Sequence, residues 1–189
     1  MFFMYNIRMN FISHLDTATL NFFESIRSPF LTYFFKAVTT LGEWWFILII
    51  VAIISFLFFR KFKMMPVLIL WLLAIGSAID AHILKVLFHR ERPIDSLVEN
   101  GTFSFPSAHA TLAMACYGFA IYLALKNIRR EWLRKIIAYL GPAGIMLIAA
   151  SRLYLGAHYL SDVVAGLLLG GAWLAIGIYA IKLTRQKKQ

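Results

Sequence analysis

Long runs of apolar residues take up most of this 189-residue sequence, and short polar segments separate them. Five such runs cover residues 44–59, 64–88, 108–125, 136–150 and 160–181. A helix needs about 20 residues to cross the hydrocarbon core of a membrane, and flanking aromatic and basic residues extend the shorter runs. With 61% hydrophobic residues, the chain has too little polar surface for a water-soluble domain. We therefore predict an all-α, polytopic membrane helix bundle of five spans.

Residues 1–43 differ from these runs because charges interrupt their aromatic and apolar residues. The pattern predicts one or two amphipathic helices that lie in the membrane interface and are broken near Ser28-Pro29. The alternative is a sixth span over residues 17–40, which would carry three charged side chains through lipid at a high energetic cost. These side chains are Glu24, Arg27 and Lys36.

Basic residues gather between the apolar runs and give the chain a formal net charge of +10. Positive segments of membrane proteins stay in the cytoplasm, so we expect residues 60–63, 126–135 and 183–189 on that side. The loops 89–106 and 151–159 then lie together on the extracytoplasmic face of the cell membrane. This distribution indicates topology and anionic lipid headgroups rather than nucleic-acid binding, for which the sequence has no recognised motif.

The chain thus divides into an N-terminal interfacial segment (1–43), a membrane domain (44–182) and a basic cytoplasmic tail (183–189). Cys116 is the single cysteine, so we expect a small core residue, and neither an intrachain disulfide nor a cysteine-based metal site. In the last run, a GxxxG motif of two glycines predicts close helix packing inside the bundle. The glycines are Gly166 and Gly170.

The segment SRLYLGAHYLSDVVAG, residues 151–166, places an arginine, a histidine and an aspartate between two apolar runs. Ionisable groups at the mouth of a membrane span are costly and usually functional. His158 and Asp162 are four apart, so on a helix they share one face and can form a hydrogen bond. A carboxylate that holds one ring nitrogen leaves the other nitrogen free to act as a nucleophile or base. A purely structural pair is hard to justify beside lipid, and the guanidinium of Arg152 suits bidentate phosphate binding.

A basic motif, KVLFHRERP, ends the second run at residues 85–93. If the helix continues to its end near Arg92, before Pro93, a stripe of four side chains shares one face. The stripe consists of His82, Lys85, His89 and Arg92. The alternative is a basic helix end that extends toward the headgroups, which explains Arg90 and Arg92 better than the deeper Lys85.

The segment FSFPSAHA, residues 103–110, precedes the third run. Pro106 and Ser107 predict a helix start, with Ser107 able to cap it. The free backbone N–H groups and the dipole of a helix N-terminus favour an anion, which would lie beside His109 in the first turn. A simple cap with an interfacial histidine is the alternative.

Together the three motifs place three cations, a helix N-terminus and two histidines on one membrane face. These are the components of a phosphoryl-transfer site, because cations surround the phosphate oxygens while the histidines supply a nucleophile and a proton donor. Three segments resemble the signatures of the type 2 phosphatidic acid phosphatase superfamily, which also includes vanadium haloperoxidases. They are Lys85-x6-Arg92-Pro93, Pro106-Ser107-Ala108-His109 and Ser151-Arg152-x5-His158-x3-Asp162, within about residues 40–180.

The resemblance implies that His158 is the nucleophile and forms a phosphohistidine, while Asp162 orients it. It further implies that His109 protonates the leaving oxygen and then activates water. The phosphate would be held by Lys85, Arg92, Arg152, Ser107 and backbone amides, including that of Ala108. No metal or cofactor is implied, in line with the lack of a carboxylate cluster for magnesium. Ala108 stands where the family usually has glycine, so we expect a slightly tighter site.

The resemblance also implies a membrane lipid phosphatase whose substrate keeps its tail in the bilayer. Undecaprenyl pyrophosphate is the first substrate hypothesis, and phosphatidylglycerophosphate or phosphatidic acid is the alternative. Residues 94–105, with Asp95 and Glu99, and the N-terminal segment are expected to shape the headgroup site, while His14, His82 and His89 match no signature position. A non-enzymatic lipid or anion carrier is the rival from another class. The apolar spans argue against a soluble haloperoxidase, and the sequence leaves the oligomeric state open.

Overall fold

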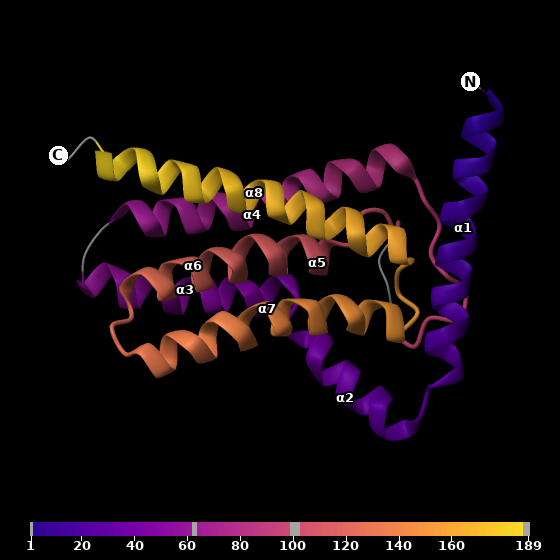
Figure 1. The fold of residues 1–189 in the computed structure, drawn as a ribbon, viewed down its shortest axis with the longest axis horizontal. Helices are drawn as coiled ribbons and strands as arrows, with labels where there is room; N and C mark the ends of the chain where they lie inside the picture. The colour runs from indigo at the N-terminus through magenta and orange to yellow at the C-terminus, as the bar shows by residue number, and fades with distance from the viewer. Residues whose placement is uncertain (1, 62–63, 99–102, 187–189) are drawn as a thin grey trace.

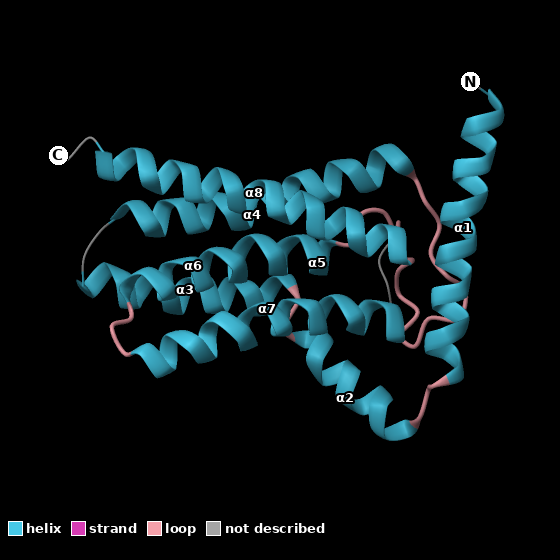
Figure 2. Cartoon of the chain, viewed as in Figure 1, coloured by secondary structure: helices cyan, strands magenta, loops and turns pink. Residues whose placement is uncertain are grey.

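The computed structural model describes residues 2–61, 64–98 and 103–186 (Figure 1). Every regular element in these ranges is a helix (Figure 2), so the predicted all-α class is confirmed. In chain order the helices are α1 (Phe2–Ser25), α2 (Pro29–Thr40), α3 (Trp44–Lys61), α4 (Met64–Phe88), α5 (Ala108–Leu112), the π-helical η1 (Ala113–Tyr117), α6 (Gly118–Asn127), α7 (Glu131–Tyr154) and α8 (Leu160–Gln186).

The helices from α3 to α8 run alongside one another as a bundle, and α1 crosses one end of it (Figure 1). Helix α8 packs on α4 and α5, while α7 packs on α6 and α2. The described parts of the connection from α4 to α5, residues 89–98 and 103–107, and the connection from α7 to α8 lie at the end that α1 crosses (Figure 1). The connection from α6 to α7 lies at the opposite end, as expected if the two motif-bearing loops share one membrane face.

Among the described residues, four helical stretches are long and apolar enough to cross a membrane. They are Met64–Phe88, Ala108–Asn127, Glu131–Tyr154 and Leu160–Thr184. A fifth candidate is the pair α2 and α3, which are bent by 51° relative to each other. The predicted five spans agree with this upper number, but the fifth span includes α2, which the sequence assigned to the interface.

The predicted break near Ser28-Pro29 is confirmed, because α1 and α2 are separate helices. Ser28 caps α2, since its Oγ accepts a hydrogen bond from the Leu31 N–H at 3.3 Å, and Pro29 occupies the first helical position. The hydroxyl of Tyr154, at the end of α7, accepts a hydrogen bond from the Ser28 N–H at 3.0 Å. This contact joins the α1–α2 turn to the end of the bundle that carries the motif loops.

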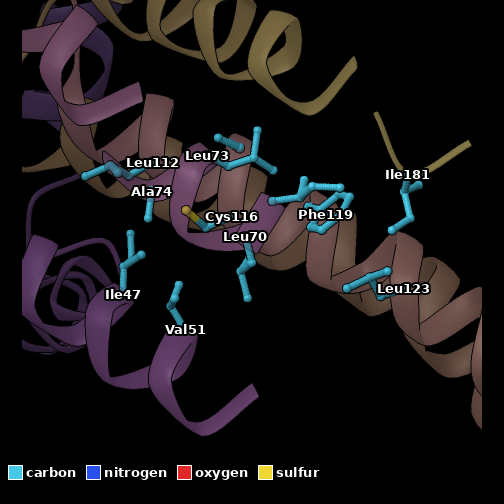
Figure 3. Close-up of a cluster of buried hydrophobic side chains, with 12 residues drawn as sticks. Ile47, Val51, Leu70, Leu73, Ala74, Leu112, Cys116, Phe119, Leu123 and Ile181 are labelled. Carbon is cyan, nitrogen blue, oxygen red and sulfur yellow. The ribbon is translucent and has the colours of Figure 1, made fainter. Parts of the chain in front are cut away.

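The apolar core lies between α3, α4, α5, η1, α6 and α8 (Figure 3). Cys116 is 2% exposed within it, so its predicted core position is confirmed. Gly166 and Gly170 lie against the backbone of α5, where an added Cβ would clash with the carbonyls of Ser107 and Thr111. The predicted GxxxG contact inside the bundle is therefore also confirmed, and it brings α8 close to the start of α5.

One predicted helix boundary is wrong. Helix α4 ends at Phe88 rather than near Arg92, because His89 adopts a left-handed φ of 46° and closes the helix with its N–H on the Lys85 carbonyl at 3.1 Å. The basic stripe from His82 to Arg92 consequently does not lie on one helix face. At the C-terminus, α8 continues to Gln186, so the segment 183–189 begins within a helix, and residues 187–189 lie outside the described ones.

Candidate active site

His158 lies in the turn between α7 and α8, two residues before α8 begins. The prediction that His158 and Asp162 share a helix face is therefore wrong, although the turn still brings them together. The Nδ1 atom of His158 is 3.6 Å from Oδ2 of Asp162, while Nε2 is 3.3 Å from Nη1 of Arg92. The ring is only 2% exposed, so one nitrogen faces a carboxylate and the other faces a guanidinium in a nearly dry setting.

Asp162 is completely buried in the first turn of α8. Its Oδ2 accepts a hydrogen bond from the backbone N–H of Tyr159 at 2.9 Å. Tyr159 directly precedes α8 and Asp162 is the third residue of that helix, so this contact has the geometry of a capping box. Its Oδ1 accepts one from Nη1 of Arg90 at 2.6 Å. These two contacts fix the carboxylate that faces His158.

Arg90 was explained from the sequence as a basic helix end, and its contacts show a different role. It bridges Asp162 to Asp16 of α1, whose Oδ2 accepts from Nη2 at 2.7 Å. Asp16 is 2% exposed and also accepts from the Ser161 N–H at 2.8 Å. An acidic residue within an aromatic, apolar helix was the available signal for Asp16, but its partner is 74 residues away.

The three predicted phosphate-binding cations each hold an oxygen of the protein. Lys85 donates to the Phe103 carbonyl at 2.7 Å, and Arg92 donates to the Ala157 carbonyl at 2.8 Å. Arg152, which is 4% exposed, donates to Oγ1 of Thr39 at 2.7 Å. All three cations lie close enough to act electrostatically on His158. The structure thus gathers them around that ring from α4, the following loop and α7.

The start of α5 lies beside α8, because the N–H of Ser107 donates to the Asp162 carbonyl at 3.0 Å. Ser107 occupies the N-cap position, but its hydroxyl makes no cap hydrogen bond, contrary to the sequence prediction. This buried Oγ has no hydrogen-bond partner within the described part of the chain. Ala108 is the first residue of α5 and is half-buried. The helix start therefore presents a hydroxyl and backbone N–H groups that have capacity for an anion.

His109, in the first turn of α5, contacts a carboxylate that the motifs do not contain. Its Nε2 lies 3.2 Å from Oε1 of Glu43, in the bend between α2 and α3. Thr39 and Glu43 thus reach Arg152 and His109 from a segment that was assigned to the membrane interface. A carboxylate directly before an apolar run was a visible sequence signal, but its partner depends on the bend.

Burial and the cations around His158 make its neutral form the favoured one. Burial lowers the pKa of His158 well below its ordinary value, and the positive charges of Arg152 and Arg92 lower it further. Burial also lowers the pKa of Arg92. For Arg90 burial acts in the same direction, but the carboxylates of Asp16 and Asp162 outweigh it and raise its pKa. Arg90 therefore stays charged between its two carboxylates, while His158 keeps a lone pair.

The other polar residues considered from the sequence are exposed where the structure describes them. His14 and His82 are exposed, and the ring of His89 packs against that of Phe103 with centroids 4.6 Å apart. Asp95 is exposed, and its backbone carbonyl accepts a hydrogen bond from Arg27 at 3.1 Å. Glu99 lies outside the described residues.

Comparison with known proteins identifies the family of the chain. Residues 65–186 match the family model of the PAP2 superfamily. The chain is 34% identical over 196 residues to the lipid A 4'-phosphatase of Bacteroides thetaiotaomicron, covering 93% of this chain and 81% of that protein. It is 31% identical over 167 residues to phosphatidylglycerophosphatase B of Bacillus subtilis, covering 87% and 82%.

Two crystal structures share the fold. The transmembrane PAP2-type phosphatidylglycerolphosphate phosphatase from Bacillus subtilis has a TM-score of 0.85 and 27% identity, covering 95% of this chain and 89% of that one. Aquifex aeolicus LpxE has a TM-score of 0.68 and 23% identity, covering 89% of this chain and 95% of that one. At this identity the likeness shows the fold alone. The predicted resemblance is confirmed: this chain belongs to the PAP2 superfamily and is a membrane lipid phosphatase.

Proposed function

We propose that the protein removes a terminal phosphate from a membrane lipid by attack of Nε2 of His158 on phosphorus. The orientation of that ring is the observation that carries the proposal. Nδ1 faces Asp162 at 3.6 Å, so the ring proton belongs on Nδ1, and the lone pair belongs on Nε2. Nε2 faces Arg92 at 3.3 Å, where the guanidinium would hold the phosphate oxygens in reach of the attacking nitrogen.

In the first step, the Nε2–P bond of a phosphohistidine forms and the bond from phosphorus to the lipid oxygen breaks. His109 gives its proton to that oxygen as it leaves. In the second step, water attacks phosphorus, His109 takes the water proton, and the P–N bond breaks to release inorganic phosphate. Asp162 stabilises the positive charge that develops on His158 in the first step.

Lys85, Arg92 and Arg152 would neutralise the phosphate and the charge that its oxygens gain in the transition state. The unpartnered hydroxyl of Ser107 and the free N–H groups at the start of α5, including that of Ala108, supply further donors. These donors need no metal ion. We accordingly propose a metal-independent reaction.

The substrate class follows from the placement of this site at one end of a bundle of apolar spans. A lipid can keep its tail in the bilayer while its phosphate enters the charged end. Positive segments at the other end support an extracytoplasmic site in the cell membrane. Undecaprenyl pyrophosphate stays the first hypothesis from the sequence. The name of one relative supports the alternative already considered, phosphatidylglycerophosphate, and the name of the other adds lipid A phosphate as a further candidate.

The test is phosphate release by detergent-solubilised protein from these lipids, phosphatidic acid and a soluble phosphate ester. We expect His158→Ala to abolish release, whereas the control His82→Ala, an exposed histidine of α4, retains it. Chelation of divalent cations should leave the activity unchanged. Wild-type activity in His158→Ala would refute the mechanism. Movement of lipid across the bilayer of proteoliposomes without any phosphate release would favour the rival function, a non-enzymatic lipid carrier.

A further inference from the structure

The bend between α2 and α3 touches the candidate active site at two points. We call residues 39–43 the elbow. Within it, Oγ1 of Thr39 accepts a hydrogen bond from Arg152 at 2.7 Å, and Oε1 of Glu43 lies 3.2 Å from Nε2 of His109. The elbow lies outside residues 65–186, which match the family. Its contacts therefore add side chains that the three sequence motifs do not supply.

The backbone of the elbow is pressed against the His109 ring. A Cβ built on Gly42 would lie 2.7 Å from Cδ2 of His109 and 2.7 Å from Cγ2 of Ile148. Such a distance is shorter than real carbon contacts, so glycine at this position permits the close approach. The side chain of Glu43 is 37% exposed, whereas that of His109 is 15% exposed. The carboxylate is thus partly solvated while it holds a largely buried ring.

On the basis of the proposed function, we propose that Glu43 is a positioning residue that orients His109 and stabilises its protonated form during departure of the lipid oxygen. A carboxylate next to Nε2 requires the proton on that nitrogen, which leaves Nδ1 to face the substrate. Once His109 carries two protons, Nδ1–H can donate to the leaving oxygen. The proton passes from Nδ1 to that oxygen, and Glu43 keeps its hydrogen bond to Nε2–H throughout.

The charges that face His109 explain why such a carboxylate is needed. Arg152 from α7 and Arg92 from the loop after α4 both act on the ring as positive charges. Two cations and burial disfavour a protonated imidazole, and a nearby carboxylate acts in the opposite direction. The site would then contain two histidine–carboxylate pairs, His158 with Asp162 for attack and His109 with Glu43 for proton transfer.

The experiment measures kcat/KM against pH for phosphate release from a lipid monophosphate by purified protein in detergent. Glu43→Gln keeps an oxygen for Nε2–H but removes the charge, and Glu43→Ala removes both. We expect kcat/KM to fall about 10- to 100-fold, with the larger loss in Glu43→Ala. Because the acid form of His109 is lost at lower pH without the carboxylate, the alkaline limb of the profile should move to lower pH in Glu43→Gln. Glu131→Gln, an exposed carboxylate at the other end of α7, is the control and should change neither quantity.

A double variant separates positioning from a general structural effect. If Glu43 acts through His109, adding Glu43→Gln to His109→Asn should cost little further activity. Thermal unfolding and gel-filtration profiles identify any variant that fails to fold. Wild-type kcat/KM and an unmoved alkaline limb in Glu43→Gln would overturn the proposal. Absence of phosphate release by the wild-type protein would instead refute the proposed function.

Discussion

Arg90 and Asp162 form an ion pair at 2.6 Å that connects the loop after α4 to the first turn of α8. The other terminal nitrogen of the same guanidinium, Nη2, is 2.7 Å from Asp16 of α1. One planar side chain therefore holds the carboxylate that faces His158 and also the helix that crosses the end of the bundle. We infer that α1 contributes to the order of the site, although no motif residue lies on it.

Replacing Arg90 with lysine should reduce activity because a point charge cannot serve both carboxylates in this geometry. We expect a fall in kcat of about 10- to 100-fold and a lower unfolding temperature, since a buried carboxylate left without its partner is costly. Measurement of phosphate release and thermal unfolding in detergent checks both effects. Arg129→Lys, at the exposed opposite end of the bundle, is the matched control. Unchanged kcat in Arg90→Lys would show that Asp162 is held without this pair.

The helices and the site differ in how much the sequence predicts of them. Apolar runs place α3, α4 and α8 within a few residues, because burial in lipid imposes composition along a whole helix. His158 and its pairing with Asp162 were also predicted, but the helical geometry assumed for them was wrong. The motif residues can be recognised from the local sequence, whereas the shape of the turn that brings them together cannot.

Long-range contacts account for the residues that were missed. Asp16 pairs with a residue 74 positions away, and Glu43 pairs with one 66 positions away. Neither pairing follows from a periodic spacing in the sequence. The pairing of Asp16 depends on the crossing of α1 over the bundle, and that of Glu43 depends on the bend of α2 relative to α3. Ser107 is a related case, because its position as a helix cap was predicted and the unpartnered state of its hydroxyl was not.

The pH dependence of His158 follows from its lowered pKa. Burial and the charges of Arg152 and Arg92 disfavour its protonation, so the neutral nucleophile persists below the ordinary pKa of histidine, about 6.5. The acidic limb of kcat/KM that belongs to His158 should therefore lie well below pH 6.5. Arg92→Gln removes one of these positive charges, which raises the pKa of His158, and the limb should move to higher pH. A limb near pH 6.5 in the wild-type protein would contradict this account.

Thr39 should affect substrate binding through Arg152. Thr39→Val keeps the size of the side chain but removes the oxygen that accepts from Nη1 at 2.7 Å. Without this acceptor the guanidinium of Arg152 is held less rigidly and binds phosphate less tightly. We therefore expect KM to rise about 3- to 10-fold, a loss of binding free energy comparable to that of one hydrogen bond. Thr40→Val is the control, since its hydroxyl contacts the Lys36 carbonyl of its own helix at 3.1 Å. Equal KM values for the two variants would argue against a role for the elbow in holding Arg152.

Ser107 offers a test in which stability and activity should separate. Its buried hydroxyl has no partner within the described residues, so Ser107→Ala should not lower the unfolding temperature. By contrast, Ser104→Ala removes a buried hydroxyl that donates to the Arg90 and Glu91 carbonyls and should cost about 1–3 kcal/mol. If Oγ of Ser107 donates to the phosphate in the transition state, Ser107→Ala lowers kcat roughly 10- to 100-fold. Paired thermal unfolding and phosphate-release assays compare the two variants. A loss of stability in Ser107→Ala together with unchanged kcat would assign this hydroxyl a structural role instead.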